Sequence, residues 1–224
     1  MRYTILTIIA FIGLASCQPK QKTIELTSTI DSTLQIKATS ILENKLTELN
    51  ALSGQAIVME VQTGHIKAMV GLERKDSANY QPCENFSQAH ESSLIHPISI
   101  LAALETGKVK LADTVDVGDG IYICKEDTIK DHNWHRGGYG KITIKQGLAS
   151  SSDIAIYKAM EIAFNGYTQA YYDQLKDMGI SNLDTPLQIL TAYNSIANNK
   201  NNQANIDSLK QALEYAVTDG LGQP

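Results

Sequence analysis

The sequence has no excess of basic residues, no apolar run long enough to span a bilayer, and no internal repeat. Its 19 lysines and arginines are outnumbered by 24 aspartates and glutamates, which gives a formal net charge of −5. A nucleic-acid-binding protein usually carries a basic stripe, so a nucleic-acid partner is not expected. What is present is 224 residues with an ordinary apolar fraction of 43%, which suits one globular domain.

The N-terminus is typical of an exported protein. Arg2 precedes an apolar run from Ile5 to Ala15, which is shorter than the ~20 residues of a transmembrane helix and matches the core of a secretory signal. The run ends in Leu14-Ala15-Ser16-Cys17, which resembles a bacterial lipobox. We predict a lipoprotein signal peptide over residues 1–17 and a polar tether over 18–26, with lipid on Cys17 holding the protein at a membrane surface. The alternative is a simple secretory signal with an incidental cysteine.

Two further cysteines, Cys83 and Cys124, follow the signal segment. Export into an oxidising compartment permits a disulfide. Sequence does not show whether the two Cα atoms come within bridging distance. A disulfide and two free thiols therefore both remain open.

The apolar pattern predicts a hairpin followed mainly by helices. Asp31 is a candidate N-cap for a helix with apolar positions from Leu34 to Leu49. Two runs suited to strands, 56–61 and 66–70, flank a turn in which Gly64 can take positive φ. Residues 71–90 are expected to be loop, and further helices are expected at 97–107, 142–157, 167–178, 187–197 and 206–217. This order indicates an α+β (mixed α/β) fold.

Several segments, in the same order, resemble the transpeptidase domain of penicillin-binding proteins, particularly the monofunctional division and elongation type. They are residues 29–35, 54–69, 97–107, 137–144 and 185–198. The resemblance implies a partial transpeptidase-like domain over residues 27–224. It also implies the penicillin-binding-protein/β-lactamase-like fold, truncated at its C-terminal side.

The family's first motif is a serine followed three residues later by a lysine, which takes the hydroxyl proton. The matching positions here hold Ser93, as the nucleophile, and His96, in place of the lysine. A neutral imidazole could act as a base, but it lacks the reach and localised charge of lysine. Glu91-Ser92 also replaces the usual Pro-Gly. The alternative interpretation is that Ser93 is a helix N-cap and His96 a packed first-turn residue.

The second motif, Ser-x-Asn, matches Ser151-Ser152-Asp153. Ser151 is kept, but Asp153 replaces an amide by a carboxylate, which removes two donors and adds a negative charge. Because the family's substrates and β-lactams carry a carboxylate, Asp153 is expected to repel them. The alternative is that Ser150 to Asp153 only cap the next helix.

The third motif, Lys-Thr/Ser-Gly on a strand that lines the cleft, has no match. Residues 219–224 resemble the segment shortly before it, and the strands that would follow have no counterpart in the sequence. The family's oxyanion hole uses a main-chain N–H of that strand, and loss of one such donor alone can cost about 10²–10³ in rate. The first hairpin is then expected to have an exposed sheet edge, where a protein partner could bind.

The segment Asp131-His132-Asn133-Trp134-His135 holds residue types that bind zinc. The family has a similar polar loop that needs no metal, so neither a metal site nor any cofactor is expected.

These departures favour a penicillin-binding transpeptidase-like envelope lipoprotein linked to cell-wall biogenesis. It is expected to be catalytically impaired and to act as a binding or scaffold module, on the periplasmic or outer-membrane face. Its expected ligands are a peptidoglycan stem peptide or a β-lactam. The alternatives are an active serine D,D-transpeptidase, carboxypeptidase or acylated β-lactam sensor that uses Ser93 with His96, and a non-functional gene remnant.

Overall fold

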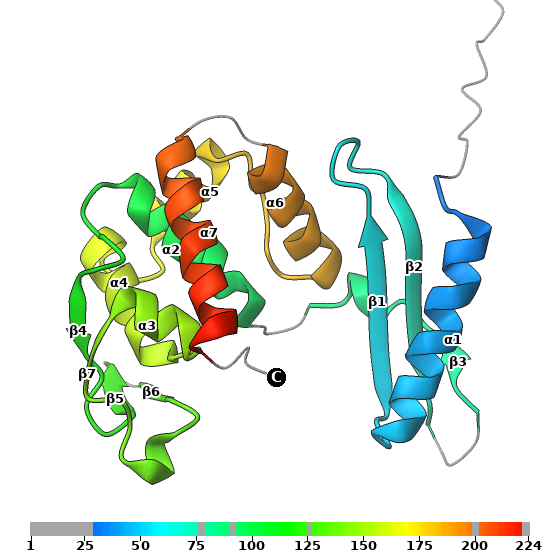
Figure 1. Cartoon of the computed structure of the whole chain (residues 1–224), viewed down its shortest axis with the longest axis horizontal. Coiled ribbons are helices and arrows are strands. Elements are labelled where there is room, and N and C mark those ends of the chain that lie inside the picture. Colours follow the sequence, from blue (N-terminus) through cyan, green and yellow to red (C-terminus); the bar gives the residue numbers. More distant parts are fainter. Residues whose placement is uncertain (1–28, 76–78, 90–92, 125–126, 199–201, 221–224) are drawn as a thin grey trace, which may run out of the picture.

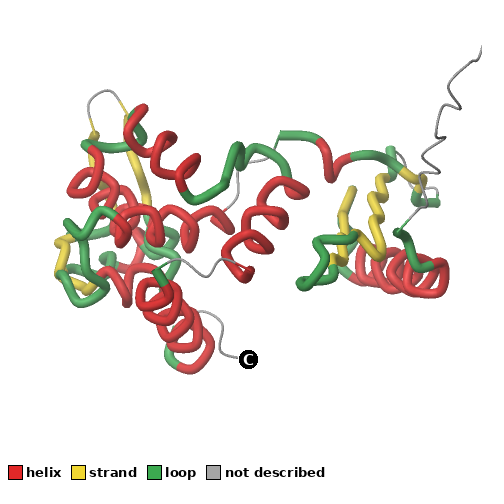
Figure 2. The backbone as a smooth tube through the Cα atoms, turned by 90° about the horizontal axis from the view of Figure 1, so that it is seen from above, coloured by secondary structure: helices red, strands yellow, loops and turns green. Residues whose placement is uncertain are grey.

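A computed structural model of the chain describes residues 29–75, 79–89, 93–124, 127–198 and 202–220. The predicted signal peptide with Cys17, the tether and the pair Glu91-Ser92 lie outside this part. Figure 1 shows an α+β arrangement, as expected: a sheet and one helix form one end, and the other helices form the other. Figure 2 shows the same division from above. None of the helices in the described ranges is long and apolar enough to cross a membrane.

The regular elements follow the expected order. The α-helices are α1 (Ser32–Glu48), α2 (His96–Glu105), α3 (Ile144–Ala149), α4 (Asp153–Phe164), α5 (Gln169–Asp177), α6 (Pro186–Asn198) and α7 (Gln203–Thr218). The strands are β1 (Ser53–Met59), β2 (Ile66–Glu73), β3 (Gln81–Pro82), β4 (Thr114–Asp116), β5 (Ile121–Cys124), β6 (Asp127–Lys130) and β7 (Lys141–Thr143). Three 3₁₀ turns are η1 (Asn85–Ser87), η2 (Ser93–Ile95) and η3 (Trp134–Arg136).

Helix α1 covers one face of an antiparallel sheet of order β1-β2-β3. The carboxylate of Asp31 accepts a hydrogen bond from the N–H of Leu34 at 2.9 Å, which confirms the predicted N-cap. Leu46 packs against Val70 and Leu72 to form a small core. Helix α1 thus buries one side of this sheet. This burial stabilises the β1–β2 hairpin, because a two-stranded hairpin alone is only marginally stable in water.

The main-chain groups of β2 that point away from β1 are satisfied by a side chain, by loops and by the short strand β3. The side-chain amide of Gln35 donates to the carbonyl of Met69 at 2.9 Å and accepts from its N–H at 2.8 Å. The N–H of Asp31 donates to the carbonyl of Lys67 at 2.9 Å, and that of Cys83 donates to the carbonyl of Gly71, also at 2.9 Å. The pairs Leu72–Pro82 and Glu73–Gln81 complete this edge.

The outer edge of β1 is open. The N–H of Arg74 donates to the carbonyl of Leu52, and the register continues through the pairs Gly54–Leu72 and Ala56–Val70. The main-chain N–H and C=O groups of Gly54 and Ala56 therefore point toward β2. Those of Gln55 and Ile57, which alternate with them, point away from β2. Within the described ranges, no hydrogen bond reaches the main chain of either residue. This side of β1 is therefore unpaired in the described part of the chain, although β1 also contacts η1 and α6.

The main core lies among the helices. Every residue of α2 from Ile98 to Leu104 is buried, and the helix packs against α4 and α7. The helices predicted at 97–107, 167–178, 187–197 and 206–217 are thus confirmed, with their ends shifted by a few residues. The single helix predicted at 142–157 is wrong: the chain forms α3 and α4 there, because the turn at Ser151 breaks the helix and Ser152 starts the next one. Gly107 follows α2 with φ +70°, a conformation that ends helices and suits glycine.

The prediction of a loop over residues 71–90 is only partly right. Strand β2 continues to Glu73 because Leu72 belongs to the core under α1, and β3 pairs with its end. The sequence also gave no sign of the short pairs β4–β7 and β5–β6. These strands are three or four residues long in a segment rich in glycine and aspartate, where alternation is too brief to detect.

Candidate active site

Ser93 and His96 lie where the chain enters the buried helix α2. Ser93 is the first residue of η2 and is exposed, while His96 opens α2 directly after it. The residue preceding α2 is Ile95, whose side chain makes no cap hydrogen bond. The interpretation of Ser93 as the N-cap is therefore wrong, because the 3₁₀ turn moves the helix start by three residues. The hydroxyl of Tyr193 on α6 donates to the carbonyl of Leu94 at 2.7 Å and holds this turn in place.

The second motif forms the connection between α3 and α4. Ser151 adopts a left-handed conformation, with φ 51°, which is uncommon for a residue with a Cβ atom. The N–H of Ser152 donates to the carbonyl of Gly147 at 2.9 Å, and its hydroxyl accepts from the N–H of Ala155 at 3.1 Å. Ser152 is thus the N-cap of α4, which confirms the predicted capping role for this stretch.

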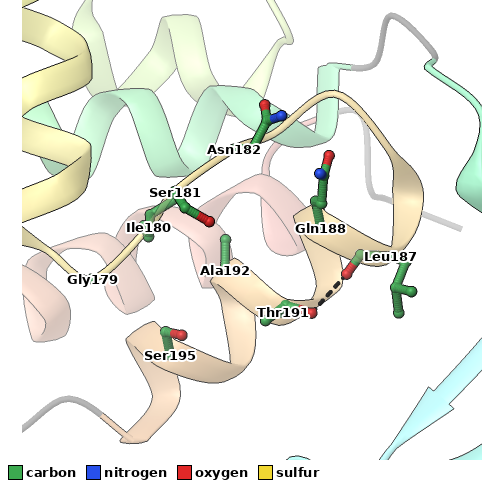
Figure 3. Close-up of a pocket in the computed structure, with 9 residues that line it drawn as sticks. All are labelled: Gly179, Ile180, Ser181, Asn182, Leu187, Gln188, Thr191, Ala192 and Ser195. Carbon is green, nitrogen blue, oxygen red and sulfur yellow. Dashed lines mark hydrogen bonds between the residues drawn. The ribbon is translucent and has the colours of Figure 1, made fainter.

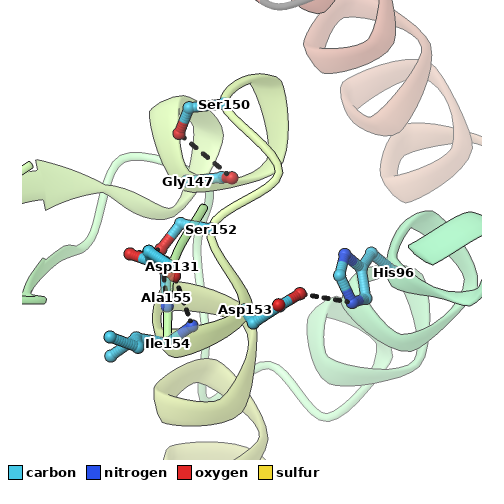
Figure 4. A network of polar contacts seen from close by, with 8 residues as sticks. All are labelled: His96, Asp131, Gly147, Ser150, Ser152, Asp153, Ile154 and Ala155. Carbon is cyan, nitrogen blue, oxygen red and sulfur yellow. Dashed lines mark hydrogen bonds and ion pairs between the residues drawn. The ribbon is translucent and has the colours of Figure 1, made fainter. Parts of the chain in front are cut away.

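A buried carboxylate fixes that connection. Asp131 is fully buried, and it accepts hydrogen bonds from the hydroxyl of Ser152 at 2.7 Å and the N–H of Ile154 at 3.1 Å (Figure 4). A negative group at a helix N-terminus is stabilised by the free N–H groups and the helix dipole. Asp131 therefore positions the second motif, a role that sequence analysis did not find because the two segments are distant in the chain.

No group of three metal-ligating side chains occurs among the residues with described positions. Asp131, the only carboxylate of the segment 131–135, already accepts hydrogen bonds from Ser152 and Ile154 at the start of α4. The ring of His132 lies against Tyr139, whose hydroxyl is 3.1 Å from its Nε2. The segment thus has structural contacts of its own.

The two positions that depart from the family contact each other. Nε2 of His96 lies 3.4 Å from Oδ1 of Asp153 (Figure 4). The histidine side chain is 12% exposed and the aspartate side chain 52%. Nδ1 of His96 is buried and has no hydrogen-bond partner in the described part of the chain. A side chain from α2 and one from α4 therefore meet at the start of both helices.

The protonation of this pair follows from its burial. Burial lowers the pKa of His96 from its usual 6.5, while the negative charge of Asp153 acts in the opposite direction. Burial also raises the pKa of Asp153, which His96 partly offsets. The imidazole is then neutral at pH 7. Its Nε2 faces the carboxylate and can carry the proton, which leaves Nδ1 as an unpaired acceptor.

The structure brings together only part of the predicted site. His96 and Asp153 are in contact, but no hydrogen bond joins the hydroxyl of Ser93 or Ser151 to either of them among the described residues. The site therefore has a serine and a histidine–aspartate pair on two neighbouring helices, without a preformed proton path.

The two cysteines are free in the structure. Cys83 follows β3, while the thiol of Cys124 on β5 contacts the hydroxyl of Tyr157 on α4. The cysteines thus belong to different ends of the molecule (Figure 1).

A surface pocket of about 240 Å³ lies between α6 and the preceding segment (Figure 3). Its polar side chains carry no charge: Ser181, Asn182, Gln188, Thr191 and Ser195. The hydroxyl of Thr191 is already bonded to the carbonyl of Leu187 at 2.8 Å. The pocket contains none of the four motif residues.

Comparisons of the sequence with family models and with known proteins point to one family. The model of the family described as "Penicillin binding protein transpeptidase domain" matches residues 54–218, more than half of the chain. Penicillin-binding protein 1A of Aquifex aeolicus (strain VF5) is 27% identical in an alignment of 164 residues, and the match covers 66% of this chain and 22% of that protein. The chain therefore spans about a fifth of the length of this curated relative.

Two solved structures show the same fold. A peptidoglycan glycosyltransferase from Burkholderia ambifaria has a TM-score of 0.66 at 18% identity, covering 87% of this chain and 75% of that one. The apo transpeptidase domain of penicillin-binding protein 3 from Burkholderia pseudomallei also has a TM-score of 0.66, at 17% identity, covering 85% and 70%. At this identity the likeness establishes the fold alone.

Proposed function

The chain belongs to the penicillin-binding protein transpeptidase family, and on this premise we propose that it is an envelope binding module with impaired acyl transfer. Its ligand would be a peptidoglycan stem peptide or a β-lactam, held at the site of Ser93, His96, Ser151 and Asp153. Lipid on Cys17 would keep the module at a membrane surface.

The contact between His96 and Asp153 carries this proposal. The family resemblance places an amine beside the nucleophile, and a lysine ammonium is a compact charge with three donors. Here the ring is neutral at pH 7 because burial lowers the pKa of His96. Its Nε2 faces Asp153, and no hydrogen bond joins it to Ser93 among the described residues. Ser93 thus lacks the group that would take its proton.

The open edge of β1 offers a place for a protein partner. The main-chain groups of Gln55 and Ile57 turn outward and have no partner among the described residues. An extended peptide can add to such an edge by main-chain hydrogen bonds. The scaffold role would then depend on this edge and not on Ser93.

The decisive experiment is intact-mass analysis of the purified protein after incubation with a fluorescent penicillin. The proposal expects no adduct that depends on Ser93, with Ser93→Ala as the control, in a sample whose folding is shown by circular dichroism. The double variant His96→Lys/Asp153→Asn, which restores both family residues, is expected to react faster than the wild type. A rapid adduct on wild-type Ser93 would overturn the impaired-enzyme proposal.

The same contact favours a second candidate, in which Ser93 is acylated with His96 as base. The Ser93 proton would pass to Nδ1 of His96, Oγ would bond to the substrate carbonyl carbon, and the C–N bond would break. The departing nitrogen would then take the proton from His96. Asp153 would orient the ring and stabilise its charged form, as the third member of such relays does.

The two candidates differ in what Asp153→Asn does. If His96 and Asp153 act together, Asp153→Asn slows the acylation of Ser93. The variant His96→Lys, made alone, is then also slower than the wild type. If the pair is only structural, neither single variant reacts measurably.

A further inference from the structure

A second cavity, of about 150 Å³, adjoins the candidate active site. Ile95, the residue before His96, forms part of its wall. The opposite walls come from α5 and from the segment that precedes α6, and three of the lining residues are tyrosines: Tyr167, Tyr171 and Tyr172. The proposed function makes no use of this cavity.

The tyrosines form a fixed aromatic wall. Tyr171 is only 3% exposed, and its hydroxyl is 2.9 Å from the buried hydroxyl of Ser99 on α2. The ring centroids of Tyr167 and Tyr172 each lie 5.2 Å from that of Tyr171, with interplanar angles of 84° and 58°. These two outer rings are 40% and 55% exposed. A buried ring thus holds two accessible rings at its sides.

The charge of the cavity is negative. Asp184 is the one charged residue among the described residues that line it, and no lysine or arginine is included. Burial raises the pKa of Tyr167 to about 12, and the neighbouring Tyr171 and, to a smaller extent, the charge of Asp153 act in the same direction. The tyrosine stays neutral at pH 7, and its hydroxyl lies within the field of Asp153.

We propose that this cavity binds an alkylammonium group, such as the side-chain amine of a peptide. The negative faces of aromatic rings attract cations, and Asp184 supplies a countercharge. Ile95, Leu175 and Leu183 offer apolar contacts to the carbon atoms next to the nitrogen. The volume is below the ~300–1,000 Å³ of pockets for drug-sized ligands, which suits a single head group.

The other ligand classes fit less well. A carboxylate or phosphate would meet the negative charge of Asp184. A purely apolar group would contact the rings but would leave the charge of Asp184 without a counterion. The ammonium group alone uses both the rings and the carboxylate.

The test is a titration of the full chain with choline and with its uncharged isostere 3,3-dimethyl-1-butanol, followed by NMR chemical shifts. We expect saturable binding of choline that is about tenfold tighter than that of the isostere. Asp184→Asn and Tyr172→Leu should each weaken choline binding about three- to tenfold, whereas Tyr172→Phe should retain it. Equal affinities for the two ligands, or no saturable shift with choline, would overturn the proposal.

Two controls separate this cavity from the candidate active site. Asp177→Asn removes an exposed carboxylate at the end of α5 that does not line the cavity, and it should leave choline binding unchanged. Ser93→Ala should also leave it unchanged, whatever the outcome with penicillin. A loss of choline binding in Ser93→Ala would contradict a separate cavity.

Discussion

The two strands of the β1–β2 hairpin differ in how they satisfy the main-chain groups that point away from the partner strand. At β2, the side chain of Gln35 acts like a short strand on Met69, and Asp31, Cys83 and β3 complete the edge. At β1, the outward groups of Gln55 and Ile57 have no partner among the described residues. An unpaired edge is a template for another strand. The outward groups of β2 are thus paired, and those of Gln55 and Ile57 on β1 are not, within the described part of the chain.

The largest effect is expected from proline substitutions in β1, which test whether an N–H group points toward β2 or away from it. Ala56 faces β2 in the register with Val70, so Ala56→Pro removes a ladder hydrogen bond and should destabilise the fold by about 2–4 kcal/mol. Ile57→Pro removes only an outward N–H, and it should cost less than about 1 kcal/mol beyond Ile57→Ala. Urea unfolding followed by circular dichroism measures both. Similar costs at the two positions would show that the β1 edge is paired.

The difference between the edges also shows what sequence can predict. The cap at Asp31, the turn at Gly64 and the buried face of α2 follow from local patterns, and all three are present. The pairing of Gln35 with Met69 joins residues that are distant in the chain. No periodicity in either segment indicates that an amide side chain completes a strand edge.

The same limit applied to the candidate site. Resemblance located Ser93, His96, Ser151 and Asp153, but it treated the histidine and the aspartate as separate losses. The structure shows that they touch. The role of Asp131 was missed for the same reason, since only the fold brings it beneath α4.

A smaller effect is expected at the closed edge. Gln35→Leu keeps the side-chain size but leaves the N–H and carbonyl of Met69 unpaired in a partly buried place. Leaving such groups unsatisfied costs about 1–3 kcal/mol. Gln211→Leu, at an exposed position on α7, is the matched control and should stay within about 0.5 kcal/mol. If both variants unfold alike, the amide of Gln35 does not secure this edge.

The smallest expected effect concerns His96, whose ring has, in the described part of the chain, one nitrogen with a partner and one without. Nε2 faces Asp153, and Nδ1 has no partner among the described residues. Because burial lowers the pKa of His96, against the pull of Asp153, the unfolded chain binds a proton near pH 6.5 that the folded chain does not. The free energy of unfolding should therefore fall as the pH drops below about 6.5, and level off below the folded pKa.

Asp153, whose pKa burial raises despite the opposing effect of His96, binds its proton more readily in the folded state. Its contribution has the opposite slope and lies above the usual pKa of 3.8. Urea unfolding of wild type and His96→Gln between pH 7.5 and 5.5 isolates the histidine, because the variant should lose the decline. His65→Gln, in the exposed turn after β1, should keep it. A decline that persists in His96→Gln would assign it to another group and would show that folding does not lower the pKa of His96.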